Sequence, residues 1–360
     1  MRKSNDSNVN WKVVRFVGID LGNARSKFCA LGRDGKVVAR GTFPTEPQAF
    51  ENLIPLPCRV AIEVGTHSPW ISRVLEAAGH ELYIANPRKV RLIFASGRKS
   101  DRLDAENLAR LVRVDPSLLH PIRHRSEGAQ ADLAVIKARQ ALVELRTKLI
   151  NTVRGLCKSQ GSKLPACSSP SFPNKVREHV PEVLRPAIQP LLDQLTELTR
   201  RIREYDDAVD KLANEKYPET SRLTQVNGVG MLTALAFVLT LDDKQRFRRS
   251  RQVGAWLGLT RKIDESGESE KRLGITKQGN EYMRQLLVNC AHYILGPFGT
   301  DCELRRFGLR IAESGGPHAK KRAVTAVARK LAVLLHKLWV SGEEYIPLGY
   351  AAERWGKDAA

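Results

Sequence analysis

Four acidic residues have the types and positions that metal-assisted phosphodiester chemistry requires. Asp20 ends an apolar run, Glu63 follows the apolar run CRVAI, and Asp101 and Asp104 lie three apart where a helix is expected to begin. Residues three apart share one face of a helix. Four gathered carboxylates repel one another, and a divalent cation such as Mg²⁺ or Mn²⁺ removes that penalty. Two such ions can hold the attacking and leaving oxygens of a phosphodiester exchange.

The second acidic pair also has a purely structural interpretation. The dipole of a helix favours acids at its N-terminus, so Asp101 and Asp104 alone do not define a metal site. Glu63 is harder to explain in this way, because a carboxylate after a buried apolar run is costly unless it is exposed or liganded. The four acids together, in the order strand, strand and helix, are therefore the more specific signal.

The elements that would position these acids alternate between strand and helix signals. Three consecutive strands come first, and the later strands alternate with helices, which is the order of the ribonuclease-H fold. Its sheet is mixed, with the first three strands antiparallel, and the strands ending at Asp20 and Glu63 are neighbours. Both carboxylates should then emerge near the same edge. The expected strands are 13–22, 26–32, 36–44, 58–65 and 80–87, and the expected helices are 66–79 and 100–114.

Charge favours a nucleic-acid partner. The net charge is +20, and the isoelectric point is near 9.9. Such an excess is usually balanced by a polyanion. An anionic membrane surface is the alternative, but only residues 319–339 approach the basic amphipathic pattern it needs, and a protein core explains their apolar face equally well. Six basic residues crowd the second acidic pair and are expected to hold phosphate: Arg88, Lys89, Arg91, Arg98, Lys99 and Arg102.

Two long helices are expected in the middle of the chain, over residues 127–158 and 182–213. Apolar residues repeat three and four apart in both, which is typical of a coiled-coil arm. The two helices would pair with each other or between chains, and the pattern does not decide which. The expected seams are Val135, Ala138, Leu142, Leu145, Leu149, Thr152 and Leu156 in the first helix, and Ile188, Leu191, Leu195, Leu198, Ile202, Tyr205, Val209 and Leu212 in the second.

The segment QVNGVGMLTALAF resembles a helix-hairpin-helix turn. Gly228 and Gly230 would let the backbone turn sharply and bring amide groups to a DNA phosphate. An ordinary tight turn between two buried helices is the alternative interpretation.

Two serines, Ser266 and Ser269, follow in a polar stretch rich in basic residues. A serine there could attack phosphorus if a metal or carboxylate helped to deprotonate it. A solvated loop serine is the simpler interpretation of either residue. The basic residues expected to contact nucleic acid are Lys271, Arg272, Lys277 and Arg284.

Other function classes have weaker support. The six cysteines form no CxxC pair and stand at no metal-ligand spacing, so reduced thiols are expected. His67, close after Glu63, is the one histidine of interest. The run VGIDLGNARSK resembles the phosphate strand-turn of actin-like ATPases, but no second phosphate loop or adenosine motif follows. The sequence shows no membrane-spanning run and no secretory leader, so we expect a cytoplasmic protein.

The chain resembles the DEDD-type serine transposases of the insertion-sequence 110 family, 1111 subgroup. The N-terminal resemblance is carried by GIDLGNARSKF, AIEVGTHSPW and KSDRLDAENLARL. The C-terminal resemblance is carried by LTQVNGVGMLTA and GLTRKIDESGESEKRLGITKQGNEYMRQLLV. Both blocks occur in the family's order, with the helical arm between them.

This resemblance implies a RuvC-like N-terminal domain in which Asp20, Glu63, Asp101 and Asp104 bind divalent metal. It implies that Ser266 attacks DNA and forms a transient phosphoserine link. It also implies a structured noncoding guide RNA that pairs with donor and target DNA, and dimers or tetramers. Many relatives have a small polar residue where Glu265 stands here, so Ser269 remains a second candidate nucleophile.

Four divisions of the chain follow from these patterns. We expect an α/β RuvC-like nuclease domain over 1–125, a coiled-coil arm over 126–218, a mostly helical serine transposase domain over 219–345 and a tail over 346–360. Two alternatives stay open: a junction nuclease that uses water as the nucleophile, and a degenerate element that binds DNA without chemistry.

Overall fold

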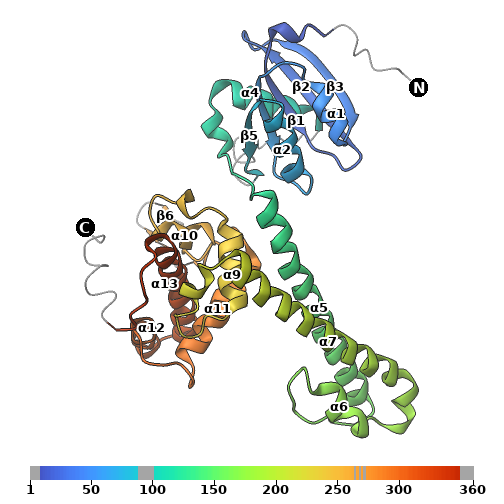
Figure 1. Cartoon of the computed structure of the whole chain (residues 1–360), viewed down its shortest axis with the longest axis vertical. Helices are drawn as coiled ribbons and strands as arrows, with labels where there is room; N and C mark the ends of the chain where they lie inside the picture. Colours follow the sequence, from blue (N-terminus) through green and yellow to red (C-terminus); the bar gives the residue numbers. More distant parts are fainter. Residues whose placement is uncertain (1–8, 88–100, 263–264, 267–268, 271–272, 349–360) are drawn as a thin grey trace. The chain divides into compact units, whose positions relative to one another are not determined.

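The structure is a computed structural model that describes residues 9–87, 101–262, 265–266, 269–270 and 273–348. The chain divides into two units, Met1–Arg125 and Ser126–Ala360 (Figure 1). The finer division of the second unit into an arm and a C-terminal domain remains a prediction.

A five-stranded sheet forms the centre of the first unit, in the order β3-β2-β1-β4-β5. β1 is antiparallel to β2 and β2 to β3, whereas β4 is parallel to both β1 and β5. The predicted mixed sheet is confirmed, and it is compatible with a ribonuclease-H-like fold. The strands are β1 Val14–Asp20, β2 Arg25–Gly32, β3 Val37–Pro44, β4 Arg59–Glu63 and β5 Glu81–Ala85.

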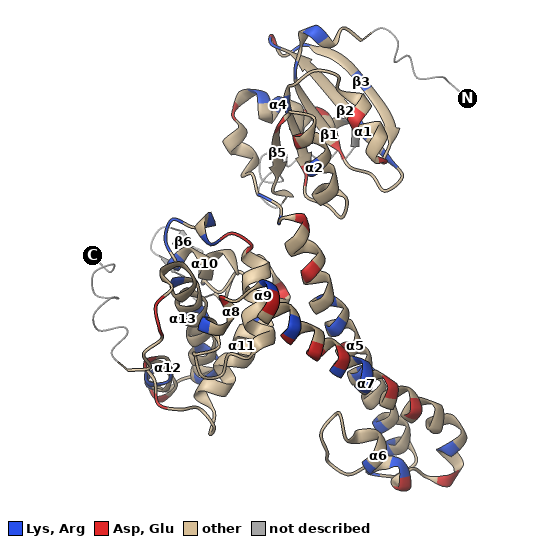
Figure 2. Cartoon of the chain, in the orientation of Figure 1, with Lys and Arg blue, Asp and Glu red and all other residues tan. Residues whose placement is uncertain are grey.

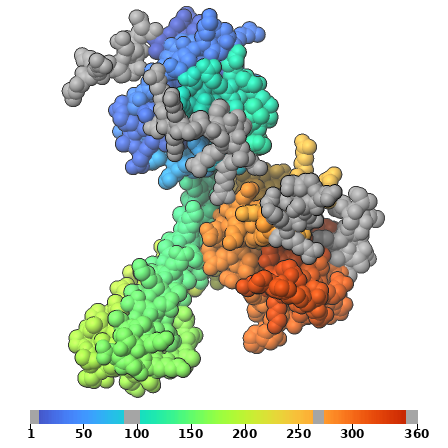
Figure 3. All heavy atoms as spheres, turned by 180° about the vertical axis from the view of Figure 1, so that it is seen from behind, coloured from blue at the N-terminus to red at the C-terminus, as the bar shows by residue number. Residues whose placement is uncertain are grey.

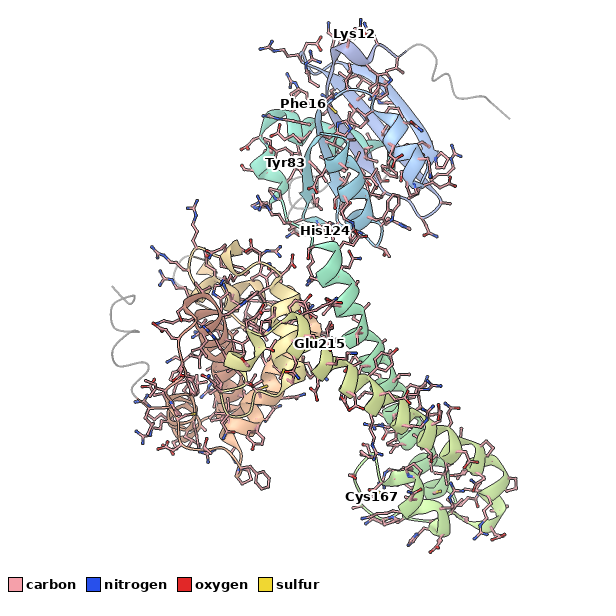
Figure 4. All side chains as sticks on the ribbon, in the orientation of Figure 1. Lys12, Phe16, Tyr83, His124, Cys167 and Glu215 are labelled. Atoms are coloured by element: carbon pink, nitrogen blue, oxygen red, sulfur yellow. The ribbon has the colours of Figure 1, made fainter. Side chains whose placement is uncertain are left out.

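Helices cover both faces of this sheet. Phe50 of α1 and Leu75 of α2 pack with Ile19 and Ile62 on one face. On the other face α4 packs against the sheet, and Figure 4 labels Phe16 and Tyr83, which lie against its apolar side chains. α1 was not predicted. The helical segments are η2 Trp11–Val13, α1 Pro47–Leu53, α2 Ser68–Ala77, α4 Asp101–Val114 and η3 Pro116–Leu119.

In the second unit, α5 (Glu127–Ser159) and α7 (Arg185–Lys216) pack along each other as an antiparallel hairpin (Figure 1). This pairing within the chain answers the question that the sequence left open. The apolar side of α7 largely follows the predicted seam, with Ile188, Leu195, Leu198, Ile202 and Val209 buried.

The seam predicted for α5 is wrong. Leu145 and Leu156 are 43% and 39% exposed. The buried stripe lies beside the predicted one, on Leu133, Ile136, Ile150, Val153 and Cys157. Two neighbouring apolar stripes run along this helix, and packing against the rest of the unit decides which of them is covered.

The Ser- and Pro-rich segment between α5 and α7 folds around its own small core. Phe172 of α6 (Phe172–Val176) packs there with Leu164 and Val180. The guanidinium of Arg154 lies 4.8 Å from the centre of the Phe172 ring and donates a hydrogen bond to the Leu164 carbonyl. Figure 3 shows this end of the arm as a rounded knob in green. Short 3₁₀ turns complete it: η4 Arg177–His179 and η5 Glu182–Leu184.

A helical bundle forms the rest of the second unit around α9, which is buried from Thr233 onward. The predicted basic helix over 319–339 is α13, and its apolar side belongs to this core. No helix in the described parts of the chain is long and apolar enough to cross a membrane. The elements are α8 Thr220–Leu223, α9 Met231–Leu241, η6 Lys244–Arg246, α10 Arg251–Trp256, β6 Glu265–Ser266, β7 Ser269–Glu270, α11 Glu281–Leu295, α12 Glu303–Glu313 and α13 Ala319–Ser341.

Candidate active site

Asp20 and Glu63 are neighbours at the carboxyl ends of two parallel strands. β1 and β4 are paired in a register that places Ile19 opposite Ile62, so each acid stands one residue beyond this pair. Adjacent strands are separated by about 4.8 Å. Ile19 and Ile62 face α2, and strand side chains alternate, so both acids belong to the α4 face. Both are half-buried. The predicted juxtaposition of these two residues is confirmed at the level of the backbone.

α4 runs antiparallel to β1 and brings its first turn to the same edge. Arg113, near the end of α4, donates a hydrogen bond to the Arg33 carbonyl, in the turn beside the start of β1. Glu106 pairs with Arg40, which lies level with the middle of β1. Asp104 therefore lies near the end of β1 that carries Asp20.

The contact between α4 and β1 depends on Gly18. A Cβ atom at Gly18 would lie 2.1 Å from the Ala105 carbonyl oxygen and 2.4 Å from the Ala109 amide nitrogen. Only a residue without a side chain permits this approach. The ion pair of Glu106 also holds α4 to the sheet. Burial raises the pKa of this carboxyl, but hydrogen bonding to Arg110 and the charge of Arg40 outweigh burial and lower it overall.

Gly18→Ala should destabilise the first unit and displace the helix that carries Asp104. The added methyl group has no space between two backbone atoms, and overpacking of this kind costs roughly 1–3 kcal/mol. Thermal unfolding of the full chain measures it. Gly65→Ala is the matched control, because a Cβ there would meet no atom within 4 Å. Equal unfolding temperatures for both variants would show that α4 does not approach β1 this closely.

The structure places three of the four predicted acids at this edge but does not form a metal cluster from them. Asp104 is half-buried, and the side chain of Asp101, the first residue of α4, lies outside the described residues. Among the described side chains, no three carboxylate, histidine or cysteine groups are arranged to hold a metal ion.

Two residues beside the acids join the loops that follow β1 and β4. His67 Nδ1 accepts a hydrogen bond from the indole of Trp70 at 3.2 Å. The proton of the neutral ring is then on Nε2, which donates to Asn23 Oδ1 at 3.1 Å. Asn23 was not predicted, because only the fold brings its loop beside His67.

Ser266 lies in a short β-hairpin rather than in an irregular loop. β6 pairs antiparallel with β7 in a register that places Ser266 opposite Ser269. The two stems of the hairpin are joined further down by hydrogen bonds from the Lys262 amide to the Gly274 carbonyl and from the Thr276 amide to the Thr260 carbonyl, both 2.9 Å long. The side chains of the two serines lie outside the described residues.

The base of this hairpin is closed by glycines at positive φ. A Cβ at Gly258 would lie 2.1 Å from the Gln278 carbonyl oxygen, and one at Gly279 would lie 2.2 Å from that of Trp256. Both glycines have φ angles in the left-handed region, +72° and +79°. The two ends of the hairpin are thus in direct backbone contact.

Known families match both halves of the chain. A family model named for the DEDD transposase of IS110 matches residues 17–159, which contain all four acids. A second, described as the transposase IS116/IS110/IS902 family, matches residues 220–297, which contain the serine hairpin. The chain belongs to the IS110 family of transposases.

Relatives are similar in sequence to this transposase over most of its length. The transposase for insertion sequence element IS1111A of Coxiella burnetii is 27% identical, covering 93% of this chain and 92% of its own. The transposase for IS1328 of Yersinia enterocolitica is 29% identical, covering 77% and 83%. A probable family 20 transposase of Pseudomonas aeruginosa is 27% identical, covering 78% and 83%.

Arg284 of the transposase supports the serine hairpin from inside. It is only 9% exposed, and its guanidinium donates to the Leu257 carbonyl at 3.1 Å and to the Gln278 carbonyl at 2.7 Å. These two residues flank the hairpin on either side. The predicted contact between Arg284 and nucleic acid is therefore wrong in this structure, because its side chain is buried against backbone. The sequence pattern did not distinguish a basic residue on a packed helix face from one in the loop.

Gly228 and Gly230 of the transposase differ in their surroundings. Gly228 has φ +92°, and a Cβ there would lie 2.9 Å from the ring of Tyr293 in α11. It is thus also needed for packing within the bundle. Gly230 stands before α9, with no atom within 4 Å of its Cβ position. α8 on the other side is a single turn, so the helix-hairpin-helix element remains a prediction.

The remaining basic positions are only partly described. Lys277 is exposed at the base of the hairpin, at φ +55°. The side chain of Arg102 lies outside the described residues, and so do these residues as a whole: Arg88, Lys89, Arg91, Arg98, Lys99, Lys271 and Arg272.

Proposed function

We propose that this transposase exchanges DNA strands through Ser266, assisted by divalent metal at Asp20, Glu63, Asp101 and Asp104. The observation that carries the proposal is the β1–β4 register, which brings Asp20 beside Glu63 at the edge where α4 begins. Hard carboxylate oxygens are the donors that Mg²⁺ and Mn²⁺ prefer, so the residue types fit such an ion. When bound, the metal would supply positive charge at the reacting phosphate.

The proposed serine step is a transesterification. The Ser266 oxygen forms a bond to phosphorus, and the bond from phosphorus to a deoxyribose oxygen breaks. The serine proton passes to a base, and the leaving oxygen takes up a proton. The phosphoserine link preserves a phosphodiester bond, so a second strand's hydroxyl can reverse the step and rejoin DNA without an external energy source. A closed hairpin base supports this role, because a nucleophile must be held in position.

We further propose that a structured noncoding RNA guides the reaction and that dimers or tetramers carry it out. The resemblance of both sequence blocks to guided transposases supports this proposal. The high positive charge of the chain supports it as well, because the chain would bind a second polyanion, the RNA, in addition to the DNA.

Strand exchange in a purified system tests the proposed function. The chain is combined with donor DNA, target DNA and RNA transcribed from the DNA flanking its gene. We expect recombinant product only with both RNA and Mg²⁺ or Mn²⁺, and none after RNase treatment or in EDTA. Full product after RNase treatment would contradict RNA guidance, and full product in EDTA would contradict the metal site.

A junction nuclease that uses water is the second candidate, and the position of Asp20 beside Glu63 on neighbouring strands is what favours it. Such an enzyme would cut DNA without a covalent intermediate. The serine variants in the Discussion separate the two functions.

A further inference from the structure

A dense basic segment precedes the serine hairpin. Residues 244–251, KQRFRRSR, contain five cationic residues and no acidic one: Lys244, Arg246, Arg248, Arg249 and Arg251. We name this segment the basic ridge. Lys244, Arg248, Arg249 and Arg251 are exposed, and none of these four has an ion-pair partner among the described residues. Figure 2 shows lysine and arginine positions gathered near α10.

The acids just before the ridge are engaged in holding the backbone. Asp242 accepts hydrogen bonds from the amide and hydroxyl of Ser126, both 2.8 Å long. Asp243 Oδ1 accepts from the Gln245 amide at 2.7 Å. Their carboxylates are therefore occupied by the start of α5 and by the turn, and they form no ion pair with the exposed cations of the ridge in the described structure.

The ridge is anchored from beneath by aromatic side chains. Phe247 lies between Trp256 and His336, with ring centres 5.7 Å and 5.6 Å away and edge-to-face packing. His336 Nε2 donates to the Lys244 carbonyl at 3.1 Å, so its Nδ1 accepts from the Ser250 hydroxyl at 3.0 Å. Burial lowers the pKa of His336, which agrees with a neutral ring. His336 thus holds the ridge near both of its ends, through the Lys244 backbone and the Ser250 side chain.

The ridge also leads directly to the proposed nucleophile. Arg251 begins α10, and that helix ends just before Gly258 at the base of the serine hairpin. The Arg329 side chain of α13 lies against Gly254 and adds an exposed cation beside α10. A polyanion bound to the ridge would therefore approach the hairpin.

We propose that the basic ridge binds the phosphate backbone of duplex DNA and directs it toward the serine hairpin. Arginine favours phosphate because its donors match two oxygens at once. Single-stranded nucleic acid is usually bound by aromatic side chains that stack on its bases. Phe247, the aromatic residue within the ridge, packs inward instead, so the ridge fits a duplex better than a single strand. Backbone contact of this kind is independent of base sequence. The inference rests on the transposase activity and not on which serine attacks.

The test compares two triple variants of the full chain. In the first, Arg248, Arg249 and Arg251 are each replaced by Gln. In the control, Lys158, Lys163 and Lys175, exposed on the arm, are replaced by Gln, which removes the same charge. Fluorescence anisotropy measures affinity for duplex DNA of arbitrary sequence at several salt concentrations. We expect the slope of log Kd against log salt to fall by about 2 to 3 in the ridge variant only.

Three further outcomes are decisive. An equal fall of the salt slope in both variants would show that the effect comes from the net charge of the chain and not from a binding site. A loss of affinity for structured RNA with duplex binding intact would also overturn the proposal. If the triple glutamine variant unfolds at a lower temperature, the three single Arg→Gln variants serve instead. Each should lower the salt slope by about 1, and unchanged slopes in all three would contradict a phosphate-backbone site.

Discussion

Ser266→Ala should abolish strand exchange, lowering its rate by roughly 10³-fold or more, because removal of a nucleophile removes the covalent step. The variant should also lose the DNA adduct that survives denaturation in detergent. The proposed phosphoserine link is the only source of such an adduct in this reaction. Gel electrophoresis of labelled DNA after quenching measures the adduct, and product formation measures the rate.

Ser269→Ala is the matched control for this prediction. Ser269 stands opposite Ser266 in the same two-stranded ladder, so the change in size and polarity occurs in the same hairpin. We expect exchange within a few-fold of the unchanged chain. Loss of the adduct in Ser269→Ala but not in Ser266→Ala would show that Ser269 is the nucleophile. Undiminished cutting in both single variants and in the double variant would favour the water-using junction nuclease.

Asp20→Asn should lower the rate of strand exchange by roughly 10³-fold, which corresponds to about 4 kcal/mol of transition-state stabilisation. The amide keeps the size of the carboxylate but loses the charge that a divalent cation requires. Because Glu63 and Asp104 remain, residual activity should need a higher Mg²⁺ concentration. Exchange rates over a Mg²⁺ titration measure both effects.

Asp34→Asn provides the control of equal charge change in the same unit. Asp34 lies in the exposed turn after β2, where its Oδ1 accepts a hydrogen bond from the Lys36 amide at 3.0 Å. Asparagine can accept the same bond, so folding should be retained and the Mg²⁺ requirement unchanged. A normal Mg²⁺ titration for Asp20→Asn would show that Asp20 binds no catalytic metal.

The sequence predicted correctly those features of the fold that depend on local apolar pattern and on the position of a residue within its strand or helix. Apolar runs ending in acids predicted the strands of Asp20 and Glu63, and the order of elements predicted that these strands are neighbours. The start of α4 at Asp101 was likewise expected. The basic composition indicated a nucleic-acid partner without reference to any contact.

Tertiary packing changed several of these interpretations. The apolar stripe of α5 lies one residue away from the predicted seam, because packing within the unit selects between two similar stripes. Arg284 is buried because two backbone carbonyls at the base of the hairpin need a donor. The sequence pattern did not predict the basic ridge, because its exposure depends on Phe247 turning inward to His336, which is 89 residues away in the chain.

The sequence by itself determined the family, the order of the five strands in the first unit, and which carboxylates and serines are candidates for DNA exchange. It could do so because apolar periodicity and residue type are local properties. Only the tertiary structure decided that Gly18 lets α4 touch β1 and that Gly258 and Gly279 close the serine hairpin. These contacts join residues distant in sequence, and no local pattern records the space available between them.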